Sequence, residues 1–225
     1  MKSIIIIGKG PSVSRCTPKF INNFDDIAIC NFPVFNDFFI NLIQNREIKY
    51  HFVNGGTFDD RFNDSFNNTH KITGIYNCHY NHTSNYKSFL KNKNLFNDSF
   101  IREKTESYLI DNKFDLNPST GTIAFNYLVR SNLYNKIALV GFDNYQQNKS
   151  VYYYDISQAN YKLFLCNEGR NNITKNGKWT GIGGHNPVIT KKYYLFEINK
   201  NKNIQFDFIT NMKLPNLSNI SIHHP

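Results

Sequence analysis

Short apolar runs, each followed by polar or glycine-rich residues, form the main pattern along this chain. The runs that predict β-strands are Ser3–Ile7, Ile27–Cys30, Tyr50–Val53, Ile137–Val140 and, as the last strand, Ile204–Ile209. Helices are predicted between them at Pro33–Asn45, Tyr86–Asn94, Thr120–Leu133 and Val188–Asn199. Short continuous apolar runs are typical of strands covered on both faces. Strands that alternate with helices predict one Rossmann-like α/β domain over residues 1–225, with a doubly wound and mainly parallel sheet.

Four polar or glycine-rich loops follow directly after predicted strands. They are Gly8–Ser12, Asn31–Pro33, Asn54–Thr57 and Gly141–Tyr145. Ligands of such sheets bind beyond the carboxyl ends of the strands, so we expect the four loops to converge on one site. A longer polar, glycine-containing stretch, residues 167–184, is predicted to be a mobile lid.

The chain carries a net charge of +9, which favours polyanions, anionic membrane surfaces or phosphorylated small molecules as partners. The absence of Lys/Arg blocks and of known nucleic-acid-binding motifs argues against nucleic acid. The four cysteines form no Cys-x-x-Cys pair, which indicates free thiols in a reducing compartment. No apolar stretch approaches the ~20 residues of a membrane span, so we expect a cytoplasmic protein with at most peripheral membrane contact.

The glycine pair after the first predicted strand suggests a phosphate site. A dinucleotide-binding fingerprint would need a third glycine where Val13 stands and an acidic residue where Asn31 stands, so the sequence argues against NAD. Gly8 and Gly10 can still let backbone N–H groups approach a phosphate, with Ser12 as a helix cap and donor. The alternative is a tight turn that needs glycine for its geometry alone.

Four further groups of residues are chemical candidates. Ser119 or Thr120 can cap the helix that follows, and a helix N-terminus can hold a carboxylate or phosphate, although capping alone explains the pattern. The tyrosines at and after Tyr145 can donate hydrogen bonds to a leaving phosphate, or can simply be packing aromatics. His185 has a side chain suited to a general base, or to capping the helix after it. The pattern Cys78-His79-x-x-His82 is a weak zinc signal because it lacks a fourth ligand.

The order of these motifs resembles the bacterial sialyltransferases of glycosyltransferase family 42, with a broader likeness to family 29. The matching pieces, from Met1 to about Glu197, are Gly8-Lys9-Gly10-Pro11-Ser12, Cys30-Asn31, Phe52-Val53-Asn54, Ser119-Thr120-Gly121, Gly141-Phe142-Asp143-Asn144-Tyr145-Gln146, Ile182-Gly183-Gly184-His185-Asn186 and Leu195-Phe196-Glu197. No single piece is specific, but their common order is moderately so.

The resemblance implies an inverting transfer of sialic acid from CMP-sialic acid to a galactose-terminated surface glycan, without a metal or other cofactor. It implies that His185 is the general base and that Tyr145 and Tyr152 hold the leaving phosphate, with Tyr153 as an alternative to Tyr152. The residues implied on the nucleotide side are Gly8, Gly10, Ser12, Asn31 and Asp143, and those on the sugar side are Asn54, Ser119 and Thr120. The same matched motifs place Lys9, Gly121, Gly141 and Phe142 in the substrate site. Residues 167–184 match the lid of the family.

Three departures from the family pattern affect these expectations. Lys9 stands where the family usually has Asn, and Asn117 where relatives carry an Arg assigned to the acceptor side. The chain also ends soon after the last predicted strand, without the longer membrane-associating tail of relatives. The alternatives are a transferase for another CMP-sugar, such as CMP-Kdo, and a non-enzymatic module that binds glycan or nucleotide. Relatives often form tetramers, so the resemblance allows a homo-oligomer, although the sequence itself shows no interface.

Overall fold

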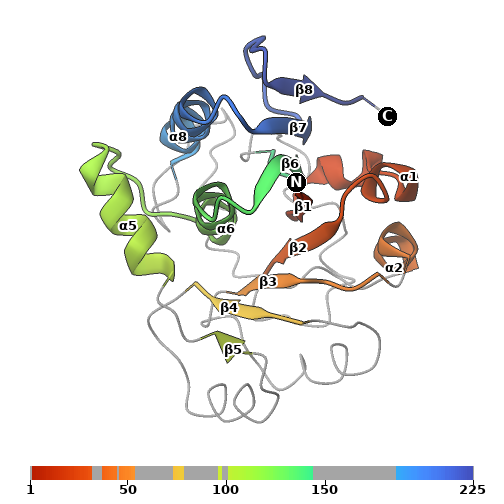
Figure 1. The fold of residues 1–225 in the computed structure, drawn as a ribbon. Helices are drawn as coiled ribbons and strands as arrows, with labels where there is room; N and C mark the ends of the chain where they lie inside the picture. The colour runs from red at the N-terminus through yellow and green to blue at the C-terminus, as the bar shows by residue number, and fades with distance from the viewer. Residues whose placement is uncertain are drawn as a thin grey trace, which may run out of the picture.

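The apolar runs of the sequence form neighbouring strands of a parallel sheet in the computed structural model (Figure 1). The structure describes residues 2–31, 37–44, 46–53, 73–78, 96–97, 101–143 and 186–224. The strands are β1 Lys2–Ile7, β2 Asp26–Cys30, β3 Tyr50–Val53, β4 Ile75–Asn77, β5 Phe96–Asn97, β6 Tyr134–Val140, β7 Gln205–Ile209 and β8 Ile220–Ile222. The helices are η1 Pro11–Arg15, α1 Pro18–Ile21, α2 Asp37–Ile43, α5 Ile101–Asp111, α6 Thr120–Arg130 and α8 Pro187–Lys200.

The strand order within these residues is β5-β4-β3-β2-β1-β6-β7-β8, and every pair of neighbours is parallel. The chain therefore starts in the middle of the sheet, moves outward on one side as far as β5, and returns to the other side of β1 with β6. The strand order reverses between β1 and β6, which makes their carboxyl ends the topological switch point where α/β sheets bind ligands.

Both faces of the sheet are covered by helices, as the prediction of a doubly wound α/β fold requires. Ile4 and Ile6 of β1 belong to a core that includes side chains of α5, α6 and α8. Ile5 and Ile7 belong to a second core that includes side chains of η1, α1 and α2. Because alternate residues of a strand point to opposite faces, a strand buried on both sides reads as a continuous apolar run.

The predicted elements agree with the structure to different degrees. Strand β3 has the predicted bounds, whereas β6 begins three residues earlier than Ile137, at Tyr134. The predicted helix Thr120–Leu133 ends at Arg130, followed by Asn132 with a left-handed backbone (φ 56°). Only Asp37–Ile43 of the predicted helix Pro33–Asn45 is helical among its described residues, and Tyr86–Asn94 lies outside the described residues.

Six described elements were not predicted from the sequence: η1, α1, β4, β5, α5 and β8. Helix α5 is rich in charged and polar residues and buries Ile101, Thr105 and Leu109, so its apolar signal is weak. Strand β8 is three residues long and pairs with β7 at the edge of the sheet. The expectation that Ile204–Ile209 is the last strand is therefore wrong.

The expectation of free thiols is confirmed for the described cysteines. Cys16, Cys30 and Cys78 are free and buried, and Cys166 lies outside the described residues. Burial raises the pKa of Cys16 and of Cys30 to about 12, so neither thiol is a nucleophile near neutral pH. In the described ranges, no helix is both long and apolar enough to cross a bilayer.

Candidate functional site at the carboxyl edge of the sheet

The loops after β1 and β6 are joined at the switch point by backbone hydrogen bonds. Gly8 N–H donates to Val140 O (2.8 Å), and Gly10 N–H donates to Gly141 O (2.9 Å). Gly141 N–H in turn donates to Ile209 O at the end of β7 (3.2 Å). The backbone hydrogen bonds of the sheet thus continue into the loops after β1, β6 and β7 and fix the positions of these three loops relative to one another.

Two glycines are required for this close approach. Gly141 has a left-handed backbone (φ 75°), a region that side chains with a Cβ rarely adopt. A Cβ on Gly10 would lie against the carboxylate of Asp143 and 2.5 Å from Gly141 O, closer than packed atoms come. Larger residues at either position would separate the β1 and β6 loops.

Asp143 fastens the loops after β1, β6 and β7 to one another. It is buried, and its Oδ2 accepts from Ser12 N–H (2.8 Å). Its Oδ1 accepts from Asn211 N–H (2.6 Å) and from the Thr210 hydroxyl (3.4 Å). Hydrogen bonds to a carboxylate are stronger than those between neutral groups, so this side chain fixes the path of all three loops.

These contacts change the interpretation of the glycine-rich loop. The N–H groups of Gly8, Gly10 and Ser12 all bond to protein acceptors, as does that of Val13, which donates to Gly10 O (3.1 Å). The Ser12 hydroxyl is also buried and donates to Ile209 O (2.9 Å). Ser12 lies inside η1, whose N-cap is Gly10, so the expectation that Ser12 caps a helix is wrong. The geometry agrees with the alternative of glycines needed for a tight turn.

Phe142 connects this loop cluster to the start of α6. Its ring lies close to both Gly8 and Gly121: a Cβ on Gly8 would be 3.3 Å from the ring, and one on Gly121 would be 2.9 Å from it. The ring also packs against Tyr194 of α8, with centroids 6.2 Å apart. Gly8, Gly121 and Phe142, which the sequence places in one site, are thus brought together.

Asn31 and Thr120, also predicted site residues, form a second contact across the edge. The Thr120 hydroxyl donates to Asn31 Oδ1 (3.1 Å), linking the loop after β2 to the first residue of α6. Asn31 has a left-handed backbone (φ 55°), and its carbonyl oxygen contacts Nε2 of His51 in β3. These contacts hold the Asn31 side chain and backbone from two directions.

His51 is fully buried within the sheet, and sequence analysis did not identify it. Burial lowers its pKa to about 4, and the hydrogen bond to the Asn31 backbone opposes this shift only in part. A neutral imidazole therefore donates Nε2–H to Asn31 O near neutral pH. The only signal in the sequence is a polar residue inside the apolar run Tyr50–Val53.

The amino ends of α6 and α8 also lie at this edge. Ser119 is the N-cap of α6 and accepts from Thr122 N–H (3.2 Å), which confirms the predicted capping role. Asn186 is the N-cap of α8 and accepts from the N–H groups of Val188 and Ile189. Helix N-termini carry partial positive charge, so both helices favour an anion at this edge of the sheet.

Two cationic side chains are near the same edge. Burial raises the pKa of Cys30, at the end of β2, and the positive charge of Lys9 opposes this shift in part. In the same way, the charge of Arg102 partly opposes the raised pKa of Cys78, after β4. The Arg102 guanidinium donates to Asn117 Oδ1 (2.6 Å), so a cation from α5 reaches the segment just before α6.

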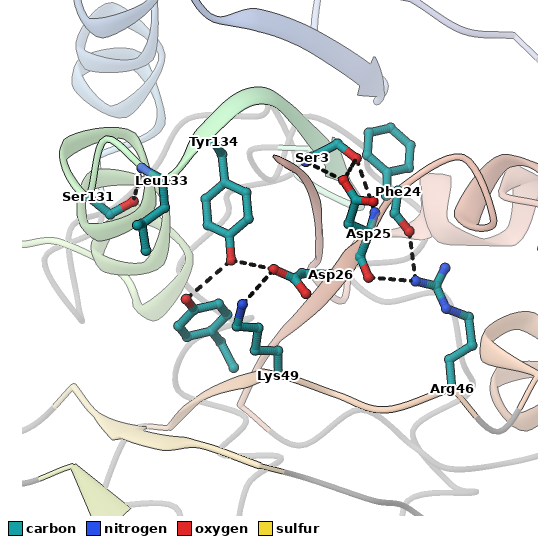
Figure 2. A network of polar contacts seen from close by, with 10 residues as sticks. Ser3, Phe24, Asp25, Asp26, Arg46, Lys49, Ser131, Leu133 and Tyr134 are labelled. Atoms are coloured by element: carbon teal, nitrogen blue, oxygen red, sulfur yellow. Dashed lines mark hydrogen bonds and ion pairs between the residues drawn. The ribbon is translucent and has the colours of Figure 1, made fainter. Parts of the chain in front are cut away.

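The opposite edge of the sheet carries a separate polar network (Figure 2). Asp26 Oδ2 accepts from Lys49 Nζ and from the Tyr134 hydroxyl, both at 2.7 Å, and Tyr134 also bonds to the Tyr50 hydroxyl (3.2 Å). Burial and the hydrogen bonds to Tyr50 and Asp26 raise the pKa of Tyr134. These residues stand where β2, β3 and β6 begin, away from the switch point, so the network braces the sheet.

Several predicted residues lie outside the described residues, and their roles stay predictions. They are Asn54, Tyr145, Tyr152, Tyr153, His185, the segment 167–184 and the two histidines of the weak zinc pattern, His79 and His82. Conversely, Thr210 and Asn211 belong to the described loop cluster although the sequence analysis omitted them. They follow directly after the predicted strand Ile204–Ile209, so the rule that selected the other loops would also have selected them.

Comparisons with known proteins agree with this fold. No family model matches the chain, and a search of curated proteins finds no match. Among solved structures, this chain is similar to the sialyltransferase CstII from Campylobacter jejuni in complex with the substrate analogue CMP-3FNeuAc. The TM-score is 0.64 and the identity 22%, over 93% of this chain and 82% of that one. The complex of CstII with cytidine-5'-monophosphate gives a TM-score of 0.60 and 20% identity, over 95% and 82% of the two chains. The chain thus has the α/β fold of CstII over nearly its whole length.

Proposed function

We propose that this protein is an inverting, metal-independent sialyltransferase that moves sialic acid from CMP-sialic acid to a hydroxyl of a galactose-terminated glycan. The observation that carries the proposal is the loop cluster at the switch point of a sheet that CstII shares. Gly8–Ser12 meets Gly141–Asp143 there, and these are motifs that the sequence has in common with family 42. CstII binds CMP and CMP-3FNeuAc in its own structures, which supports a CMP-sugar as the donor.

In the proposed reaction, the acceptor oxygen attacks the anomeric carbon while the bond from that carbon to the CMP phosphate oxygen breaks. His185 takes the proton of the acceptor hydroxyl, and CMP leaves as a phosphate monoester anion. In the sequence, His185 immediately precedes Asn186, the N-cap of α8. A histidine near its ordinary pKa is suited to this role.

The leaving phosphate needs charge stabilisation, which the N–H groups of Gly8, Gly10 and Ser12 do not offer. The N–H groups of Gly8, Gly10 and Ser12 already have acceptors within the protein. We therefore assign phosphate stabilisation to the hydroxyls of Tyr145 and Tyr152, assisted by the partial positive charge of the helix N-termini. Gly8, Gly10, Asn31, Gly141 and Asp143 then shape the nucleotide side of the donor site by their packing, while Asn54, Ser119 and Thr120 line its sugar side.

The first test is release of CMP from CMP-sialic acid in the presence of EDTA, with and without lactose as acceptor. Release stimulated by lactose would support the proposal. Binding of CMP without release would favour another CMP-sugar donor such as CMP-Kdo, and the lack of both would favour a non-enzymatic glycan-binding module. In each of the last two cases the proposed reaction is wrong.

Replacing His185 tests the assignment of the base. We expect His185→Ala to lower turnover by about 10²- to 10⁴-fold, the range for loss of a general base, and to leave CMP affinity within about twofold. His224→Ala is the matched control, because it removes an imidazole from the exposed C-terminal segment. Normal turnover in His185→Ala would exclude His185 as the base.

A further inference from the structure

A groove between α5 and the chain that returns to α6 has no role in the donor site described above. Its volume is about 520 Å³, within the range of roughly 300–1,000 Å³ found for small-ligand sites. Helix α5 contributes Glu106 and Ile110, and the chain that returns from α5 to α6 contributes Lys113, Phe114, Asp115, Leu116 and Asn117. Helix α5 lies on the flank of the molecule in Figure 1, beside α6.

The base of the groove is apolar and held in place. Leu116 is buried, and the ring of Phe114 meets the rings of Tyr193 and Phe196 of α8 edge-on, with centroids 5.4 and 5.3 Å apart. On the rim, Ile110 is 73% exposed, which is unusual for so large an apolar side chain. The groove therefore offers apolar surface both at its base and at its edge.

The polar groups of the groove include both signs of charge. Glu106 and Asp115 accept hydrogen bonds, Lys113 donates them, and the amide of Asn117 does both. Arg102 pairs with Glu106 and donates to Asn117, so the charges around the groove balance. A purely apolar ligand would cover the charged groups of Lys113 and Asp115, and a polyanion would gain no net attraction. A neutral sugar chain fits better, because its hydroxyls donate and accept while its C–H faces cover apolar surface.

One end of the groove adjoins the proposed reaction site. Arg102 donates to Asn117 Oδ1 (2.6 Å) and to Glu106 Oε1 (2.7 Å), so it ties the returning chain to α5 at this end. Asn117 is two residues before Ser119, the N-cap of α6 at the carboxyl edge. A glycan that enters the site from this side would pass Asn117 and lie along α5.

We propose that this groove binds the part of an oligosaccharide acceptor that lies beyond the sugar receiving the transfer. The inference rests on the proposed transferase function and adds to it a preference for longer neutral acceptors. The walls are preformed, because the returning chain is fastened to α5 through Arg102 and to α8 through Phe114. The protein then loses little conformational entropy when a glycan binds.

The test compares lactose with lacto-N-neotetraose, a neutral galactose-terminated tetrasaccharide, as acceptors. We expect the wild-type KM for the tetrasaccharide to be lower on the order of fivefold to tenfold, the worth of a few added contacts. Ile110→Arg places a long charged side chain over the groove and should abolish this difference without changing the KM for lactose. Leu133→Arg is the matched control, since Leu133 is another exposed apolar residue (57%) and lies beyond the other end of α6.

The outcomes separate the groove from the transfer reaction. Equal KM values for the two acceptors in the wild type, or a preference that survives Ile110→Arg, would overturn the groove as a glycan site while leaving the transferase function intact. If no transfer occurs, calorimetric titration with the tetrasaccharide decides. If the tetrasaccharide no longer binds Ile110→Arg but still binds Leu133→Arg, the result supports the groove as a glycan site. If both variants bind it equally, or neither binds it, the groove is not a glycan site.

Discussion

At the amino edge of the sheet, Asp26 is held by two side chains, whereas at the carboxyl edge Asp143 is held mainly by the backbone of neighbouring loops. Asp26 accepts from Lys49 and Tyr134, which join the starts of separate strands. Asp143 accepts from the amides of Ser12 and Asn211. Bonds between side chains brace elements that the sheet already positions, but bonds to loop amides determine the shape of a binding site.

Because of this difference, we expect similar substitutions at the two edges to have different effects. Changes at the amino edge should alter stability alone, because the sheet itself keeps the strands in register. Changes at the carboxyl edge should alter stability and ligand binding together, because the loop paths depend on individual side chains. The following variants test this distinction.

The largest effect is expected for Asp143→Ala. It leaves the buried amides of Ser12 and Asn211 without an acceptor, at about 1–3 kcal/mol each, so we expect the free energy of unfolding to fall by about 3–5 kcal/mol. CMP binding, followed by its thermal shift, should be lost with it. Asp143→Asn keeps one acceptor oxygen and should have an intermediate effect. Unchanged CMP binding in Asp143→Ala would show that the loops keep their paths without the carboxylate.

A smaller effect, visible as a dependence on pH, is expected from His51. Its pKa is about 4 in the folded protein against an ordinary 6.5, so between these values the unfolded chain binds a proton that the folded chain does not. The free energy of unfolding should therefore fall as the pH falls, by on the order of 2 kcal/mol between pH 7 and pH 5. His51→Gln keeps a donor for Asn31 O and should lose this part of the acid sensitivity in urea unfolding.

The control for this measurement is His224→Gln, which replaces an exposed histidine and should retain the acid sensitivity of the wild type. If His51→Gln lost as much stability as the wild type between pH 7 and pH 5, other groups would account for the effect. The imidazole would then not be held neutral by burial.

The smallest effect is expected for Tyr134→Phe at the amino edge. It removes one hydroxyl but leaves Asp26 paired with Lys49, so the free energy of unfolding should fall by about 1 kcal/mol. CMP affinity should not change. Thr120→Val is the matched change at the other edge: it removes the hydroxyl that donates to Asn31 and should also weaken CMP binding severalfold. Equal effects of both variants on CMP affinity would contradict the distinction between the edges.

Much of the fold was predictable because β1, β2, β3 and β6 are buried on both faces. Most of their buried residues had to be apolar, and the loops after them then had to share one edge. Helix α5 was not predictable in this way, because it buries Ile101, Thr105 and Leu109 and otherwise presents polar residues. An element that covers a core with one narrow stripe leaves little periodic signal.

The members of the candidate site were more predictable than their contacts. Gly8, Gly10, Asp143, Asn31 and Thr120 were selected from motifs, and the structure brings them together in the two groups described. The sequence did not indicate that the amides of the glycine-rich loop would be used within the protein. Nor did it indicate His51, whose contact with Asn31 depends on the register between β2 and β3. Such pairings follow from tertiary structure and leave no local pattern.

The buried thiols of Cys30 and Cys78 can report transient local opening of the protein. Cys30 is the last residue of β2 and Cys78 follows β4, so both stand at the carboxyl edge. Because burial raises the pKa of both thiols, an alkylating reagent can modify them only when this edge opens. The rate of alkylation at each cysteine can be followed by mass spectrometry of its peptide. This rate then measures the free energy of opening of the site without an introduced label. The decrease in rate on adding a ligand measures how much the ligand raises that free energy.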